Sequence, residues 1–118
     1  PSVLMVAQQE YAEFLMLHQI LEGKDIPEPE QVGVCYEAYL NALADLTEEL
    51  RRLLLDSLRK QKDEHADEML ARMEEIFQFL SNFDHPNSII PGLRHKRDVL
   101  RRVLEESRRD LTLAKVKG

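Results

Sequence analysis

The chain has 118 residues, 43% of them hydrophobic and 32% charged, which suits one globular domain and excludes a disordered chain or a membrane-spanning segment. Only 4 Gly and 5 Pro interrupt it, so an all-β fold with its many turns is largely excluded. The single cysteine, Cys35, rules out an intrachain disulfide framework and predicts a reduced, cytoplasmic location. The first residue is Pro1, so we expect the chain to be a piece of a longer protein.

Charge is distributed unevenly along the chain. Residues 1–91 carry 7 Lys and Arg against 18 Asp and Glu, whereas residues 92–118 carry 9 against 4. A basic C-terminal helix on an acidic body is a first indication of an anionic ligand. The alternative is that these charges merely solvate a long exposed helix.

Apolar residues recur every three or four positions in four segments, which predicts helices over residues 3–22, 34–61, 63–81 and 91–115. Pro27 and Pro29 break the chain between the first two helices, with a short helical turn from Pro29 to Val32. The segment SNFDHPNS at residues 81–88 reads as a turn, and Pro91 is a favoured first helical residue.

No alternating run of β-branched residues indicates a strand. The economical architecture is therefore all-α, an antiparallel bundle of four helices that forms one domain over residues 1–118.

The first predicted helix is apolar on nearly every side, which is typical of a helix that is covered all round. Four helices of this size cannot bury that much apolar surface. We therefore expect either further chain or an oligomer interface to cover it. His18 lies among these apolar residues and is predicted to pack in the core.

Two acidic pairs on hydrophobic helices are the sharpest chemical feature. Glu10 and Glu13 are spaced i, i+3, and Asp45 and Glu49 are spaced i, i+4, so each pair shares one helix face. If the two helices pack together, their carboxylates converge into an all-oxygen cluster that suits Mg²⁺ or Mn²⁺. Such an ion could activate water against a phosphodiester. The alternative is that the acids are exposed, or pair with Arg51 and Arg52.

The second feature is a run of basic residues on the last predicted helix, which could follow a phosphate backbone. Its members are Arg94, His95, Lys96, Arg97, Arg101, Arg102, Arg108 and Arg109. No aromatic residue is interleaved with them, so base stacking on this helix is not expected. Asp98, Glu105 and Glu106 could instead pair with them along the helix.

Three segments together resemble the translin superfamily, and most closely the archaeal proteins of its translin-associated factor X branch. They are EYAE at 10–13, YLNALADLTEELRR at 39–52 and FLSNFDHPNSIIPGLRHKRDVLRRVLEESRRDLTLA at 79–114. The resemblance implies an all-α fold of seven helices, of which this chain has the last four and lacks the N-terminal helices.

The resemblance also implies the activity, a Mg²⁺-dependent endoribonuclease that acts on single-stranded RNA inside a closed, hollow oligomer. The positions that match the catalytic carboxylates are Glu10, Glu13 and Asp45, which would also bind the metal, with Glu49 as an associated acid. Arg52 matches an arginine common to translin and to the translin-associated factor X branch. It could pair with the acidic cluster or contact phosphate, and we group it with the basic run as a candidate for nucleic-acid binding. The implied partners are RNA or single-stranded DNA, and either further copies in an octamer-like barrel or a translin-like subunit.

Two other classes of function stay open from the sequence. One is a single-stranded nucleic-acid-binding protein of the translin type that does not cleave its ligand. The other is a purely structural helical bundle. Dependence on a divalent ion separates the nuclease from the binding protein, and salt-dependent binding of a single strand separates the binding protein from the structural bundle.

Overall fold

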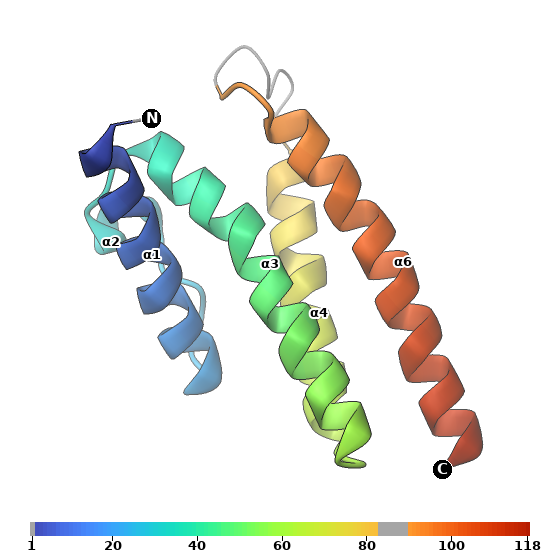
Figure 1. Ribbon diagram of the computed structural model, residues 1–118. Coiled ribbons are helices and arrows are strands. Elements are labelled where there is room, and N and C mark those ends of the chain that lie inside the picture. Colours follow the sequence, from blue (N-terminus) through green and yellow to red (C-terminus); the bar gives the residue numbers. More distant parts are fainter. Residues whose placement is uncertain (1, 83–89) are drawn as a thin grey trace. The chain divides into compact units, whose positions relative to one another are not determined.

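A computed structural model describes residues 2–82 and 90–118 of the chain. Within these ranges it is all-α, with five helices and no strand, which confirms the predicted fold class (Figure 1). The helices are α1 (Val3–Leu21), α2 (Pro29–Val32), α3 (Tyr36–Arg59), α4 (Asp63–Ser81) and α6 (Leu93–Lys117). The predicted turn residues Asp84, Pro86 and Asn87 lie outside the described ranges. None of the described helices is long and apolar enough to cross a membrane.

The chain divides into two compact units, Pro1–Leu46 and Thr47–Gly118. The long helix α3 contributes its first half to the first unit and its second half to the second. The prediction of one domain stays a prediction.

The first unit contains α1, α2 and the beginning of α3. Ser2 caps α1, because its Oγ accepts a hydrogen bond from the Met5 backbone N–H at 3.0 Å. Gly23, at φ +75°, ends the helix as predicted, since its N–H reaches back to the Ile20 carbonyl at 2.9 Å. The inner face of α1 is a narrow buried stripe of Ala12, Met16 and Ile20.

The connection between α1 and α3 contains the predicted helical turn, α2. Its start is fixed by Pro29 at the first position and by a capping box between Glu28 and Gln31. The buried Tyr39 ties this connection to α3, because its hydroxyl donates to the Pro27 carbonyl at 2.7 Å. The chain returns in this way to the beginning of α1, where the Cys35 N–H donates to Gln8 Oε1 at 2.9 Å.

The second unit consists of the second half of α3, α4 and α6. Residues 60–62 reverse the chain between α3 and α4, and α6 runs antiparallel beside α4 (Figure 1). The buried residues of α4 recur every three or four positions, so the helix presents one continuous apolar face. These are Ala66, Met69, Met73, Ile76 and Leu80, and α6 contributes Leu93, Leu100, Leu104 and Leu111.

Polar contacts reinforce the packing of α6 in this unit. Arg51 of α3 donates to Ser107 Oγ at 2.9 Å and pairs with Asp110 at 2.7 Å. Two further ion pairs join α6 to α4, Arg108 to Glu74 at 2.8 Å and Lys115 to Asp67 at 3.0 Å.

Three details differ from the sequence-based expectations. The last helix begins at Leu93 rather than Pro91, because Gly92 takes a left-handed conformation at φ +82°. Helix α3 begins at Tyr36 rather than Val34, after the left-handed Gly33. His18 was predicted to pack in the core and is instead exposed, because it lies on the face of α1 opposite the buried stripe.

Candidate functional site

The two predicted acidic segments meet in the first unit through a hydrogen bond that involves an amide. Gln9 Nε2 of α1 donates to Asp45 Oδ2 of α3 at 2.6 Å, in a partly buried environment. Gln9 is next to Glu10 and one helical turn before Glu13. The contact therefore places Asp45 beside the stretch of α1 that carries both glutamates.

The acids of this site differ in their accessibility. Glu13 and Asp45 are half-buried, and both have interaction partners, whereas Glu10 is exposed. Helix geometry explains the difference, because Glu13 is about 40° from Gln9 around the helix axis and Glu10 is about 100° away. Glu13 therefore lies at the edge of the inner face, and Glu10 lies outside it.

The chemistry of these side chains suits Mg²⁺, which takes oxygen ligands and often binds through only one or two carboxylates. Across residues 2–82 and 90–118, however, no three His, Cys, Asp or Glu side chains are grouped closely enough to hold a metal ion. One oxygen of Asp45 already accepts the Gln9 amide. The metal site at Glu10, Glu13 and Asp45 stays a prediction.

Glu49, the associated acid, belongs to the second unit. Its carboxylate pairs with Arg52 at 3.3 Å, one turn along the same helix. This contact matches the alternative interpretation, in which acids on α3 pair with neighbouring arginines. Arg51 pairs with acids of α6 instead.

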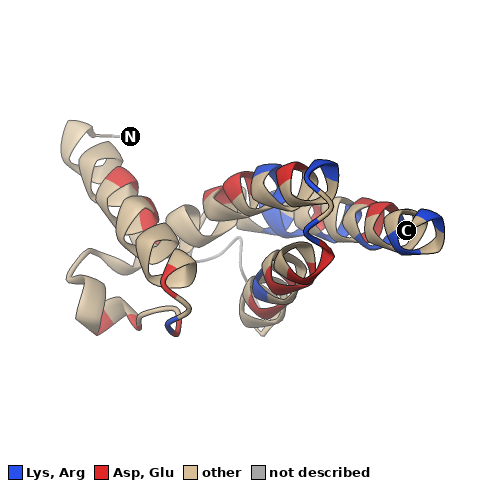
Figure 2. Cartoon of the chain, turned by 90° about the horizontal axis from the view of Figure 1, so that it is seen from below, with Lys and Arg blue, Asp and Glu red and all other residues tan. Residues whose placement is uncertain are grey.

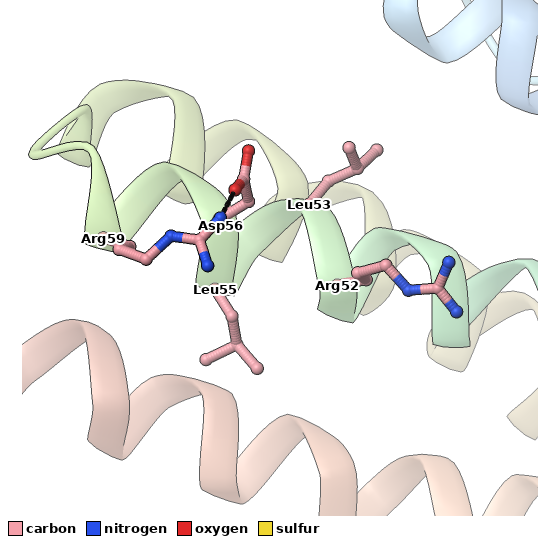
Figure 3. A pocket seen from close by; sticks show the side chains of 5 residues that line it. All are labelled: Arg52, Leu53, Leu55, Asp56 and Arg59. Carbon is pink, nitrogen blue, oxygen red and sulfur yellow. Dashed lines mark hydrogen bonds and ion pairs between the residues drawn. The ribbon is translucent and has the colours of Figure 1, made fainter.

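Arg52 also lines an open pocket of about 550 Å³ on the second unit, together with Leu53, Leu55, Asp56 and Arg59 (Figure 3). Arg59 contacts the Asp56 carboxylate, as the dashed line in Figure 3 marks. A hydrogen bond from Lys60 is the largest cause that holds the pKa of Asp56 below its ordinary value. Both arginines are highly exposed, so their guanidinium groups remain accessible to an anion in solvent.

The basic residues of α6 alternate with acidic ones, whereas α1 carries acids and no Lys or Arg (Figure 2). Arg101 pairs with Asp98 at 3.5 Å, and its guanidinium lies 5.5 Å from the Phe77 ring centroid. Arg97 is about one-fifth exposed and also contacts Asp98, at 3.6 Å. Arg94 and Lys96 have interaction partners as well. The predicted pairing of Asp98 along the helix is therefore observed.

Sequence reasoning missed two residues that lie with site residues in the structure, Gln9 and Arg59. Gln9 was missed because it is uncharged, although it shares the three-and-four spacing of the inner stripe. Arg59 follows Arg52 by seven residues, a spacing that places both on one face of α3. Arg102 and Arg109, by contrast, belong to the basic run that the sequence predicts; both are exposed on α6, and no ion pair to either is found among the described residues.

Comparison with known proteins identifies the family of the chain. The sequence model of the Translin family matches residues 4–108. An uncharacterised protein of Methanocaldococcus jannaschii is 32% identical over 109 residues, which are 92% of this chain and 49% of that protein.

Two solved structures are similar in both fold and sequence. The crystal structure of AfC3PO matches with a TM-score of 0.82 and 34% identity over 94% of this chain and 58% of that one. The structure of the AfC3PO–duplex RNA complex matches with a TM-score of 0.79 and 32% identity over the same shares. The chain thus spans about half the length of these relatives. Since the family model matches most of its residues, the chain belongs to the translin family.

Proposed function

We propose that this chain is part of a Mg²⁺-dependent endoribonuclease, with its reactive centre at the acids of α1 and α3. The observation that carries the proposal is the 2.6 Å hydrogen bond between Gln9 and Asp45, which brings the two acidic segments together. Membership of the translin family and likeness to a protein that has been solved with duplex RNA support RNA as the ligand.

The residues that would hold Mg²⁺, or Mn²⁺, are Glu10, Glu13 and Asp45. The ion, when bound, would lower the pKa of an attacking water and offset charge on the scissile phosphate. The hydrogen bond from Gln9 would hold the Asp45 carboxylate in one orientation. Asp45 would then lose less conformational freedom when it binds the metal ion. A carboxylate not fully committed to the metal would take the proton of the attacking water, and Glu10 is the most exposed acid of the three.

The RNA backbone would be held by exposed arginines. Arg52 is the strongest candidate, because it lines a pocket with Arg59 and its own side chain is 75% exposed despite the ion pair with Glu49. Arg94, Lys96 and Arg101 of α6 would add phosphate contacts, while the more buried Arg97 would contribute less. Such contacts give affinity that falls steeply with salt and carries no base information.

The assembly that would enclose the RNA is a homo-oligomer of the translin type, or a complex with a translin-like subunit. The family match and the solved structures support this part of the proposal at the level of fold. Because one of the similar structures contains duplex RNA, both single-stranded and duplex RNA are substrates to test.

The second candidate is a nucleic-acid-binding protein that does not cleave. The highly exposed Arg52 and Arg59 on one face of α3 favour it, because phosphate contacts by arginine need no metal.

A cleavage assay on labelled RNA separates the two candidates. Single-stranded and duplex RNA are incubated with the protein in Mg²⁺ and in EDTA, alongside Glu13→Gln and the exposed control Glu48→Gln. The nuclease proposal predicts Mg²⁺-dependent cleavage that Glu13→Gln loses while it still binds RNA, and that Glu48→Gln retains. Binding of RNA without cleavage in either condition would favour the second candidate.

A further inference from the structure

Gln9 is the polar member of an otherwise apolar inner face of α1. It precedes the buried Ala12, Met16 and Ile20 at the three-and-four spacing of that face. A polar side chain in such a position needs a partner, because an amide without one loses its hydrogen bonds to water on folding. Its partner is Asp45, whose Oδ2 accepts from Gln9 Nε2 at 2.6 Å.

This polar contact is not what packing alone would select. Two apolar side chains of similar shape could close the same contact between α1 and α3 with little or no loss of stability. The amide and the carboxylate therefore call for an explanation other than the packing of the first unit.

The direction of the hydrogen bond limits what Asp45 can do. A carboxylate has only acceptor oxygens, so the Gln9 amide must present its NH₂ group to Asp45. One of the two oxygens of Asp45 is thereby engaged. A metal ion at this carboxylate would find at most one oxygen to bind, unless it displaced the amide.

A carboxylate that binds through one oxygen discriminates between divalent ions. Mg²⁺ requires nearly octahedral geometry, keeps several waters and is bound through one or two carboxylates. Ca²⁺ takes six to eight oxygen ligands and readily accepts both oxygens of one carboxylate. The engaged Oδ2 of Asp45 withholds that second oxygen from Ca²⁺ and costs Mg²⁺ nothing.

We propose that Gln9 is a positioning residue that makes the metal centre selective for Mg²⁺ over Ca²⁺ by holding Asp45 as a one-oxygen ligand. The inference rests on the proposed function and deepens it, because it assigns the choice of ion to a residue that binds neither the ion nor RNA. Groups that orient metal ligands in this way commonly change metal affinity by about 10–100-fold when they are removed.

Gln8 provides a matched control on the same helix. Its Oε1 accepts from the Cys35 backbone N–H at 2.9 Å, so it also joins α1 to the chain just before α3, and that contact involves no acid. Methionine at either position keeps an unbranched side chain of similar length and a similar helix propensity, and it removes the amide.

The test is Mn²⁺ binding followed by electron paramagnetic resonance, with Mg²⁺ and Ca²⁺ as competitors. Mg²⁺ should displace Mn²⁺ from the parent at lower concentration than Ca²⁺ does. Gln9→Met should bind Mn²⁺ about tenfold more weakly, because Asp45 is no longer held in place. Its preference for Mg²⁺ over Ca²⁺ should also shrink severalfold, since both oxygens of Asp45 can then face Ca²⁺. Gln8→Met should match the parent in both respects.

The ratio of the two competitors separates positioning from a general structural role. Loss of a merely structural contact would weaken the binding of both ions by the same factor and leave their ratio unchanged. An unchanged ratio in Gln9→Met, or the same change in Gln8→Met, would overturn the inference.

A second variant keeps the inference testable if Gln9→Met does not fold by circular dichroism. Gln9→Asn keeps an amide but is one methylene shorter, so it withdraws the donor from Asp45 and should shift the ratio in the same direction. A parent from which Ca²⁺ displaces Mn²⁺ as well as Mg²⁺ does would also overturn the inference. A parent that binds no Mn²⁺ would remove the metal centre itself, whereas a parent that binds Mn²⁺ beside unchanged Gln9 variants would contradict only the role of Gln9.

Discussion

Arg51 is expected to stabilise the second unit far more than its neighbour Arg52. The Arg51 side chain is only 22% exposed, and it joins α3 to α6 through Ser107 and Asp110. Replacing it with Met keeps the aliphatic stem and removes the guanidinium. The substitution therefore isolates the polar contacts from most of the packing.

The expected loss follows from the partners of Arg51. The ion pair with Asp110 at 2.7 Å is a charge-assisted hydrogen bond that is partly shielded from water. A contact of this kind contributes about 1.5–3 kcal/mol before solvent screening is taken into account. Solvent screens both ion pairs of Arg51, because Asp110 is about one-third exposed and Glu106, whose contact at 3.9 Å is weak, is about half exposed. Ser107 keeps a hydrogen bond to the Val103 carbonyl at 2.7 Å, so it is not left without a partner. We expect Arg51→Met to cost about 1–2 kcal/mol.

Urea unfolding followed by circular dichroism measures this loss. Arg51→Met should lower the midpoint with an unchanged slope, and a loss of that size lowers Tm by about 3–10 °C. The control is Arg52→Met, because Arg52 is 75% exposed and its pair with Glu49 should contribute under about 1 kcal/mol. Equal stability of the two variants would refute the assignment of Arg51 as the anchor of α6.

Three further predictions concern local stability. Ser2→Ala should lower stability by about 1 kcal/mol, because the Met5 N–H loses its cap, and faster hydrogen exchange at Met5 would show it. Gln61→Gly should raise Tm, since Gln61 has φ +59° in the turn after α3 and glycine adopts that conformation without strain; a lower Tm would contradict this account. Tyr39→Phe should cost about 1 kcal/mol in urea unfolding by leaving the Pro27 carbonyl without its donor, and unchanged stability would show that water replaces the hydroxyl.

The sequence predicts the helices well because their apolar residues follow a period that only a helix satisfies. It even identifies the four-residue helix that begins at Pro29, where the proline leaves few alternatives. The start of α6 was misplaced because a proline at a helix start is common, whereas the left-handed conformation of Gly92 depends on local geometry.

The candidate site was only partly accessible from the sequence. Spacing shows that Glu10 and Glu13 share a face, but it cannot say how α1 is rotated toward α3. That rotation brings Gln9 to Asp45 and leaves Glu10 in solvent. The same uncertainty explains His18, because a helix that is apolar on two faces does not reveal from its own residues which face is turned inward.

Binding of Mn²⁺, followed by electron paramagnetic resonance, tests the central claim most directly, because it reports on the acids of α1 and α3 without requiring RNA. Titration of the parent should show one bound ion per chain that Mg²⁺ displaces. Glu13→Gln and Asp45→Asn should each abolish that binding, and Glu48→Gln should leave it unchanged. A parent that binds no Mn²⁺, or variants that bind it like the parent, would contradict a metal centre at these residues.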